Sequence, residues 1–116
     1  MKRLDNQNLK DLIRAELGLY KTEFDNQNFD LAFRHLERVH IISQPFPWRH
    51  TFIHLKMLQF AILTFRPTEI IVQFLYSLFS AKFSTFGIFP KGNTGGANAI
   101  FKGQMEIPKD LQMELN

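Results

Sequence analysis

Three histidines and a glutamate have the spacing of metal ligands on helices. His50 and His54 are four positions apart, so a helix over residues 48–65 would present both imidazoles on one face. Glu37 and His40 are three positions apart in the preceding segment, a spacing at which a carboxylate and an imidazole can reach one ion. A mixed set of Glu and His ligands suits zinc, iron, manganese, nickel or copper.

The register of the predicted helices brings these side chains together. Helices over residues 29–43 and 48–65 should run antiparallel around the turn at residues 44–47, which places His40 within about one helical turn, ~5.4 Å, of the His50–His54 pair. In the first segment, residues 5–24, Glu16 lies between apolar positions on the helical wheel and about level with Glu37. We therefore predict a divalent transition-metal site made by Glu16, Glu37, His40, His50 and His54.

Other interpretations of the same residues stay open. A buried His can simply form a hydrogen bond with a buried Glu, which would make a structural polar layer that fixes helix register. In that case the chain would be a helix-hairpin module that binds a protein or peptide in a groove between the hairpins, with Phe46 and Trp48 as exposed aromatics. A third alternative is homodimerisation through the apolar segment 67–84.

The elements that position these residues are helical. Apolar residues recur at helical spacing over residues 5–24, 29–43, 48–65 and 67–84, and short polar or proline-containing turns separate the four segments. Short connections favour antiparallel neighbours. We predict an all-α single domain over residues 1–116: two antiparallel hairpins, distantly similar to tetratricopeptide repeats, form a helical core over 1–84, and an extended tail over 85–116 packs back on it.

The last two segments carry polar residues without a clear motif. Glu69, Gln73, Tyr76, Ser77 and Ser80 form a stripe along the fourth helix, which we interpret as its solvent face; the alternative is a small polar pocket. The tail contains Gly92, Gly95 and Gly96, but the Gly-Lys-Ser/Thr ending of a phosphate-binding loop is missing. We interpret this stretch as a tight structural loop.

Composition excludes several classes of protein. The chain of 116 residues has no Cys, so disulfide scaffolds, iron–sulfur clusters and thiolate zinc sites are excluded. Its net charge of +3 comes from scattered Lys and Arg, which argues against nucleic-acid binding. Polar residues interrupt the most apolar stretch, and the first thirty residues contain no apolar signal region, so we expect neither membrane spanning nor secretion but a cytoplasmic location. The sequence contains no catalytic motif, so we expect a binding protein rather than an enzyme.

Several of these residues together resemble a known family. They are the run from His35 to His40, then Gln44, His50, His54, Met57-Leu58, Glu69, Gln73, the tail Pro90-x-Gly92-Asn93-Thr94-Gly95, and Met105-x-Ile107-Pro108. This pattern resembles bacterial domain of unknown function family 3703 over about residues 29–111. The resemblance implies a bacterial, single-domain, mostly helical protein, and it implies no particular activity.

Overall fold

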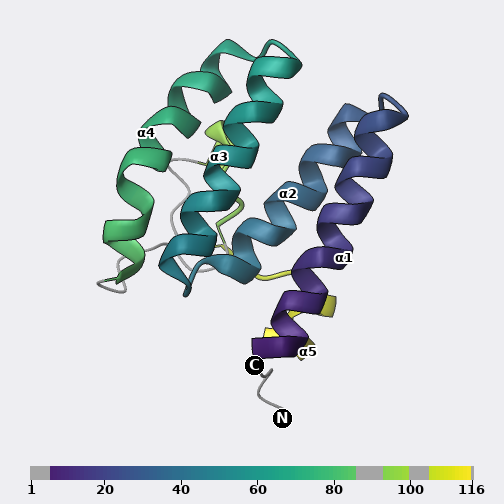
Figure 1. Cartoon of the computed structure of the whole chain (residues 1–116), viewed down its shortest axis with the longest axis vertical. Helices are drawn as coiled ribbons and strands as arrows, with labels where there is room; N and C mark the ends of the chain where they lie inside the picture. Colours follow the sequence, from purple (N-terminus) through teal and green to yellow (C-terminus); the bar gives the residue numbers. More distant parts are fainter. Residues whose placement is uncertain (1–5, 86–92, 100–104, 116) are drawn as a thin grey trace.

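The computed structural model describes residues 6–85, 93–99 and 105–115. The elements are α1 (Asn6–Asp25), α2 (Phe29–Ser43), α3 (Pro47–Leu63), α4 (Pro67–Thr85), the 3₁₀ turn η1 (Ala97–Ala99) and α5 (Lys109–Leu115). The four long helices pack in sequence order, α1 on α2, α2 on α3 and α3 on α4, as two antiparallel hairpins side by side (Figure 1). The predicted all-α fold is confirmed.

Two of the turns are closed by the same backbone pattern. At the end of α3, the Arg66 N–H donates to Ala61 O and the Phe65 N–H donates to Ile62 O, while Phe65 has a φ of 50°. At the end of α1, the Asn28 N–H donates to Glu23 O, and Gln27 has a φ of 61°. This is the Schellman arrangement, in which glycine is usual at the left-handed position. The third helix therefore ends at Leu63, two residues earlier than the sequence predicts, because Phe65 leaves the helical conformation.

An aromatic cluster fills the space between α1, α2 and α3. The fully buried ring of Phe60 contacts four other rings with centroid separations between 5.1 and 6.4 Å: Tyr20, Phe24, Phe29 and Phe33. Ala32, Leu36, Ile53 and Met57 complete the cluster from α2 and α3. The α2–α3 pair thus packs on α1 through this cluster, and its fixed position sets the register of the histidines farther along α2 and α3.

The described parts of the tail, residues 93–99 and 105–115, pack back on the helices. Residues 93–99 lie against α2 and α4 through hydrogen bonds to His40, Gln44, Glu69 and Gln73. Leu111 of α5 is buried with Leu9 of α1 and Ile42 of α2, so the chain end closes the lower end of the bundle (Figure 1). The tail residues Ile88, Phe89, Gly92, Ile100 and Phe101 lie outside the described residues.

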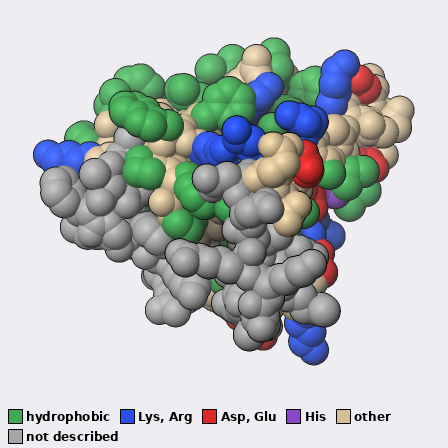
Figure 2. Space-filling view, turned by 60° about the horizontal axis from the view of Figure 1, so that its bottom comes forward, with side chains coloured by type: hydrophobic (Ala, Val, Ile, Leu, Met, Phe, Trp, Pro, Cys, Tyr) green, Lys and Arg blue, Asp and Glu red, His purple; other side chains and the backbone are tan. Residues whose placement is uncertain are grey.

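The polar stripe of α4 points inward at Glu69, Gln73, Tyr76 and Ser77, contrary to the interpretation as a solvent face, and the side chain of Ser80 lies outside the described part of the structure. Gln73 is completely buried, and Glu69, Tyr76 and Ser77 are partly buried. The outward positions of α4 carry Ile71, Phe74, Leu75, Leu78 and Phe79, each roughly half exposed or more. Hydrophobic side chains accordingly cover much of the surface on the α4 side of the molecule (Figure 2). The polar side of α4 faces inward because its side chains form hydrogen bonds with the tail backbone and with His54 of α3. The helical wheel of α4 alone does not reveal these partners.

In the described part of the chain, no helix combines the length and the apolar character that a membrane span requires.

Candidate metal centre

Three imidazoles converge where α2 and α3 meet. The Nε2 atom of His40 lies 2.9 Å from Nε2 of His50 and 3.1 Å from Nε2 of His54, and the last two atoms are also 3.1 Å apart. His50 and His54 lie one turn apart on α3, and His40 reaches them from the last part of α2. The sequence-predicted register is therefore correct for these three residues, and their nitrogens form a small triangle.

The outer nitrogens of two of these rings are held by hydrogen bonds. Nδ1 of His40 lies 2.8 Å from the backbone oxygen of Asn93, and Nδ1 of His54 lies 2.7 Å from Oε1 of Gln73. The amide of Gln73 is oriented by its other end, because its Nε2 donates to the Glu69 carboxylate at 3.0 Å and to Gly95 O at 2.6 Å. Both of those partners can only accept, so the oxygen of Gln73 must face His54.

These bonds decide where the protons are. A carbonyl oxygen accepts only, so Nδ1 of His40 and Nδ1 of His54 each carry the proton of a neutral ring. The Nε2 atoms of both rings then present lone pairs to one another across 3.1 Å, with no hydrogen between them. His50 can supply at most one proton to this triangle. At least one of the three close contacts therefore joins two lone pairs, which a cation between them would stabilise.

Burial keeps the rings neutral. His40, His50 and His54 are all buried. Burial lowers the pKa of His50 to about 3 and the pKa of His54 to about 4, with the charge of His54 adding to the effect on His50. Burial, together with the charges of the other two rings, holds the pKa of His40 well below its usual range. Neutral imidazole is the form that binds metal ions, so the site is ready for a ligand role at neutral pH.

Glycine is required where the tail crosses the triangle. Gly95 has a φ of 83°, and a Cβ atom at this position would lie 2.7 Å from both Cδ2 and Nε2 of His40. The Gly95 N–H donates to the side-chain oxygen of Asn93, which fixes the loop at this close approach. The tail thus covers the nitrogen triangle directly, and no residue with a side chain fits there without displacement.

Glu16 is buried as the helical wheel predicts, but it is not near the triangle. Its carboxylate accepts from Arg38 Nε at 2.8 Å and lies 2.7 Å from Nδ1 of His35. Arg38 also pairs with Asp110 of α5, and this second partner raises the pKa of the guanidinium. Glu16 therefore joins α1 to α2 and, through Arg38, to α5. The prediction that it shares one layer with the histidines does not account for these local partners, Arg38 and His35.

Glu37 also falls outside the group of converging ligand atoms. Its carboxylate accepts a hydrogen bond from Thr94 of the tail, and burial raises its pKa. Glu69 is used in a similar way: it accepts from the Ala97 N–H at 2.7 Å and from Gln73. Among the residues described, the structure thus brings together three of the five predicted ligands, all histidines, and assigns the acidic residues to the tail and to Arg38.

Sequence reasoning missed the groups that orient the rings. Gln73 appears in the sequence analysis as part of the polar stripe and of the family pattern but not as a partner of His54, although its spacing of four from Glu69 is a signal for a hydrogen-bonded pair on one helix face. Asn93 acts through its backbone oxygen, for which the residue type gives no signal. Such outer partners fix the tautomer and direction of metal-binding imidazoles.

Comparison with known proteins identifies a family but no characterised relative. No curated protein and no solved structure matches the chain. A family model described as "Protein of unknown function (DUF3703)" matches residues 7–115, which is nearly the whole chain.

Proposed function

We propose, for a chain that belongs to the DUF3703 family of proteins of unknown function, that it binds one transition-metal ion through His40, His50 and His54. The observation that carries this proposal is the lone-pair contact between Nε2 of His40 and Nε2 of His54. Both outer nitrogens are committed as donors, so no proton is left for this contact. A metal ion accepts all three lone pairs at once and removes the conflict.

The size of the triangle supports metal coordination. An ion about 2.1 Å from each nitrogen would see N–metal–N angles of roughly 90° at the present separations. Tetrahedral angles require each pair of nitrogens to be about 3.4 Å apart, so the rings need to move by only a few tenths of an ångström. Three imidazoles without a carboxylate favour zinc, copper, nickel or iron over manganese.

The test is metal content and metal-dependent stability of untagged protein. We expect about one ion per chain in protein purified without chelator, and a lower melting temperature after chelation that returns when zinc or copper is added. His50→Gln and His54→Gln should abolish stoichiometric binding while circular dichroism still reports a helical fold. Wild-type protein that holds no ion and is stabilised by none of zinc, copper, nickel, iron or manganese would contradict the proposal.

His35 provides the matched control. It is the histidine of the chain that does not belong to the nitrogen triangle, and it lies on the same helix as His40. Its ring contacts Glu16 and not the nitrogen triangle. The His35→Gln variant should therefore retain the wild-type metal content. If it loses the ion together with the triangle variants, binding depends on overall stability and not on the three imidazoles.

Self-association is a second candidate function, and the outward face of α4 is the observation that favours it. Ile71, Phe74 and Leu78 are exposed along this helix. A second copy could cover the apolar face of the first. Sedimentation should then show a concentration-dependent dimer that Leu78→Glu dissociates, and a monomer at high concentration would exclude this function.

A further inference from the structure

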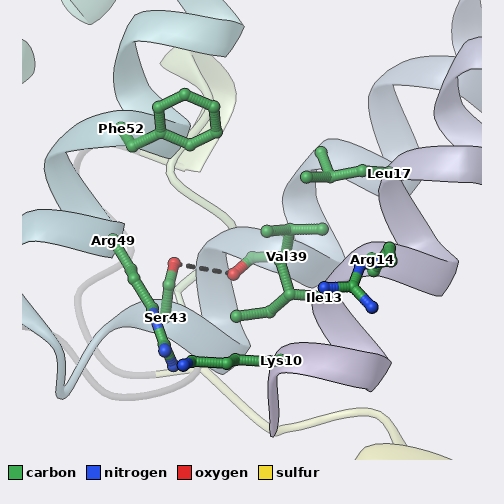
Figure 3. Close-up of a pocket in the computed structure, with 8 residues that line it drawn as sticks. All are labelled: Lys10, Ile13, Arg14, Leu17, Val39, Ser43, Arg49 and Phe52. Atoms are coloured by element: carbon green, nitrogen blue, oxygen red, sulfur yellow. Dashed lines mark hydrogen bonds between the residues drawn. The ribbon is translucent and has the colours of Figure 1, made fainter.

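A cavity of about 290 Å³ lies between α1, α2 and α3, apart from the nitrogen triangle. One part of its wall is apolar and is formed by Ile13, Leu17, Val39 and Phe52. The other part is basic and is formed by Lys10, Arg14 and Arg49 (Figure 3). Its volume is at the lower end of the range for small-molecule pockets, and the mixture of an apolar wall with a few polar groups is typical of them.

Among the described residues, no acidic side chain balances the charge of the basic part of the wall. Lys10 and Arg49 extend from α1 and α3 toward one another (Figure 3), and both also line a neighbouring cavity of about 360 Å³ beside Trp48. None of the described residues that line either cavity is acidic. Arg14 is different, because its guanidinium lies 3.7 Å from the Asp11 carboxylate. Two cationic side chains that face each other without an acid attract an anion between them.

Arg49 carries a second, independent sign of a missing partner. Its Nη1 atom is buried and donates to no acceptor in the described part of the chain. A buried guanidinium N–H without an acceptor is costly, and such groups are uncommon in native proteins. The guanidinium is held over the ring of Phe46, with Cζ 5.3 Å from the ring centroid, so its direction is fixed. A ligand oxygen would supply the acceptor that the described residues do not.

The start of α3 adds positive potential at the same end of the cavity. Arg49 lies in the first turn of this 17-residue helix, which contains no acidic residue there. The residue at the N-cap is Phe46, whose side chain cannot accept a hydrogen bond, so no side chain caps the helix. The first backbone N–H groups of a helix have no acceptor within it and favour an anion nearby.

We propose that this cavity binds a small amphipathic carboxylate, such as a medium-chain fatty acid. The carboxylate would lie between Lys10 and Arg49, where the guanidinium offers paired donors to its two oxygens. The hydrocarbon chain would lie along Ile13, Leu17 and Phe52 and leave water there. This inference does not rest on the metal proposal, because no ring of the nitrogen triangle lines the cavity.

The test is a titration of the full chain with octanoate, kept below the concentration at which octanoate forms micelles. Binding is monitored through the NMR chemical shifts of the backbone amides. We expect saturable binding at one site, with the largest shifts at the residues that line the cavity. Uncharged 1-octanol and short butyrate should each bind at least tenfold more weakly, since the first lacks the anion and the second lacks the chain. Equal binding of octanol and octanoate would overturn the proposal.

Substitutions distinguish octanoate binding in the cavity from non-specific adsorption of octanoate to the protein surface. Lys10→Gln and Arg49→Gln should each weaken octanoate binding at least fivefold, while Lys21→Gln, which removes another lysine of α1 outside the cavity, should have no effect. Two results would overturn the proposal. One is that Lys10→Gln, which alters a lysine on the helix surface, binds octanoate with the affinity of the wild type. The other is that octanoate changes amide chemical shifts mainly on the apolar face of α4.

Discussion

Acid should unfold the metal-free protein because three buried imidazoles must stay neutral in the fold. In the unfolded chain a histidine takes up a proton near pH 6.5, whereas the pKa values of folded His50 and His54 are about 3 and about 4. A lowered pKa in the fold means that the unfolded state binds more protons below pH 6.5. Stability is therefore complete above that value and is lost as the pH falls toward 4.

The size of this loss follows from the two pKa values. Between pH 7.5 and pH 5, each of the two imidazoles lowers the free energy of unfolding by about 2 kcal/mol, which makes about 4 kcal/mol together. His40 adds to the loss in the same direction, since burial also lowers its pKa. The raised pKa of Glu37 acts in the opposite direction, because the fold binds that proton more readily than the unfolded chain does. A loss of this size is a large fraction of the stability of a small domain.

The assay is urea unfolding followed by circular dichroism, with chelator present, at several values between pH 7.5 and pH 5. The His50→Gln variant removes one of the titrating rings, so its loss of unfolding free energy over this range should be about 2 kcal/mol smaller than that of the wild type. Comparing the variant with the wild type cancels the contribution of Glu37. Equal unfolding free energies at pH 7.5 and pH 5, or the same pH dependence in the variant, would refute the reasoning.

Three further substitutions test other parts of the structure by urea unfolding at neutral pH. Gly95→Ala should destabilise the fold by about 2–4 kcal/mol, because its methyl group meets the His40 ring at a positive φ; unchanged stability would mean that the tail does not approach the ring. Phe65→Gly should stabilise the protein by about 1 kcal/mol, since an exposed side chain is removed from a left-handed position, and a loss would show that this ring has a packing role. Arg38→Met should cost about 2–3 kcal/mol by leaving the buried Glu16 carboxylate with only His35, and a negligible effect would show that this carboxylate is solvated or protonated.

The sequence predicts helices and the histidine register well because both depend on local periodicity. Residues four apart on one helix share a face whatever surrounds them, so His50 and His54 could be paired from spacing alone. The short turn at residues 44–47 then allowed His40 to be placed by counting outward on both helices. These inferences need only helix geometry and a tight connection.

The acidic ligands and the orientation of α4 could not be predicted in this way. Whether Glu16 turns to a metal or to Arg38 depends on which cation is nearer after the helices pack, and Arg38 and His35 lie within reach. The inward direction of Gln73 depends on the tail, whose backbone supplies an acceptor for its amide. Backbone groups of a distant loop leave no trace in the residue types, so the wheel of α4 was assigned to the wrong side.

The order of the histidines along the chain has a consequence for biosynthesis. His40 and His54 are 14 positions apart, so both histidine-bearing helices leave the ribosome early. Gln73 emerges 19 positions after His54, and Asn93 emerges 53 positions after His40. The three imidazoles therefore emerge before the residues that set their tautomers and before the glycine that covers them. The segment that carries Asn93 and Gly95 closes the site, so an ion captured by the three histidines during translation would be enclosed only after this later segment has emerged.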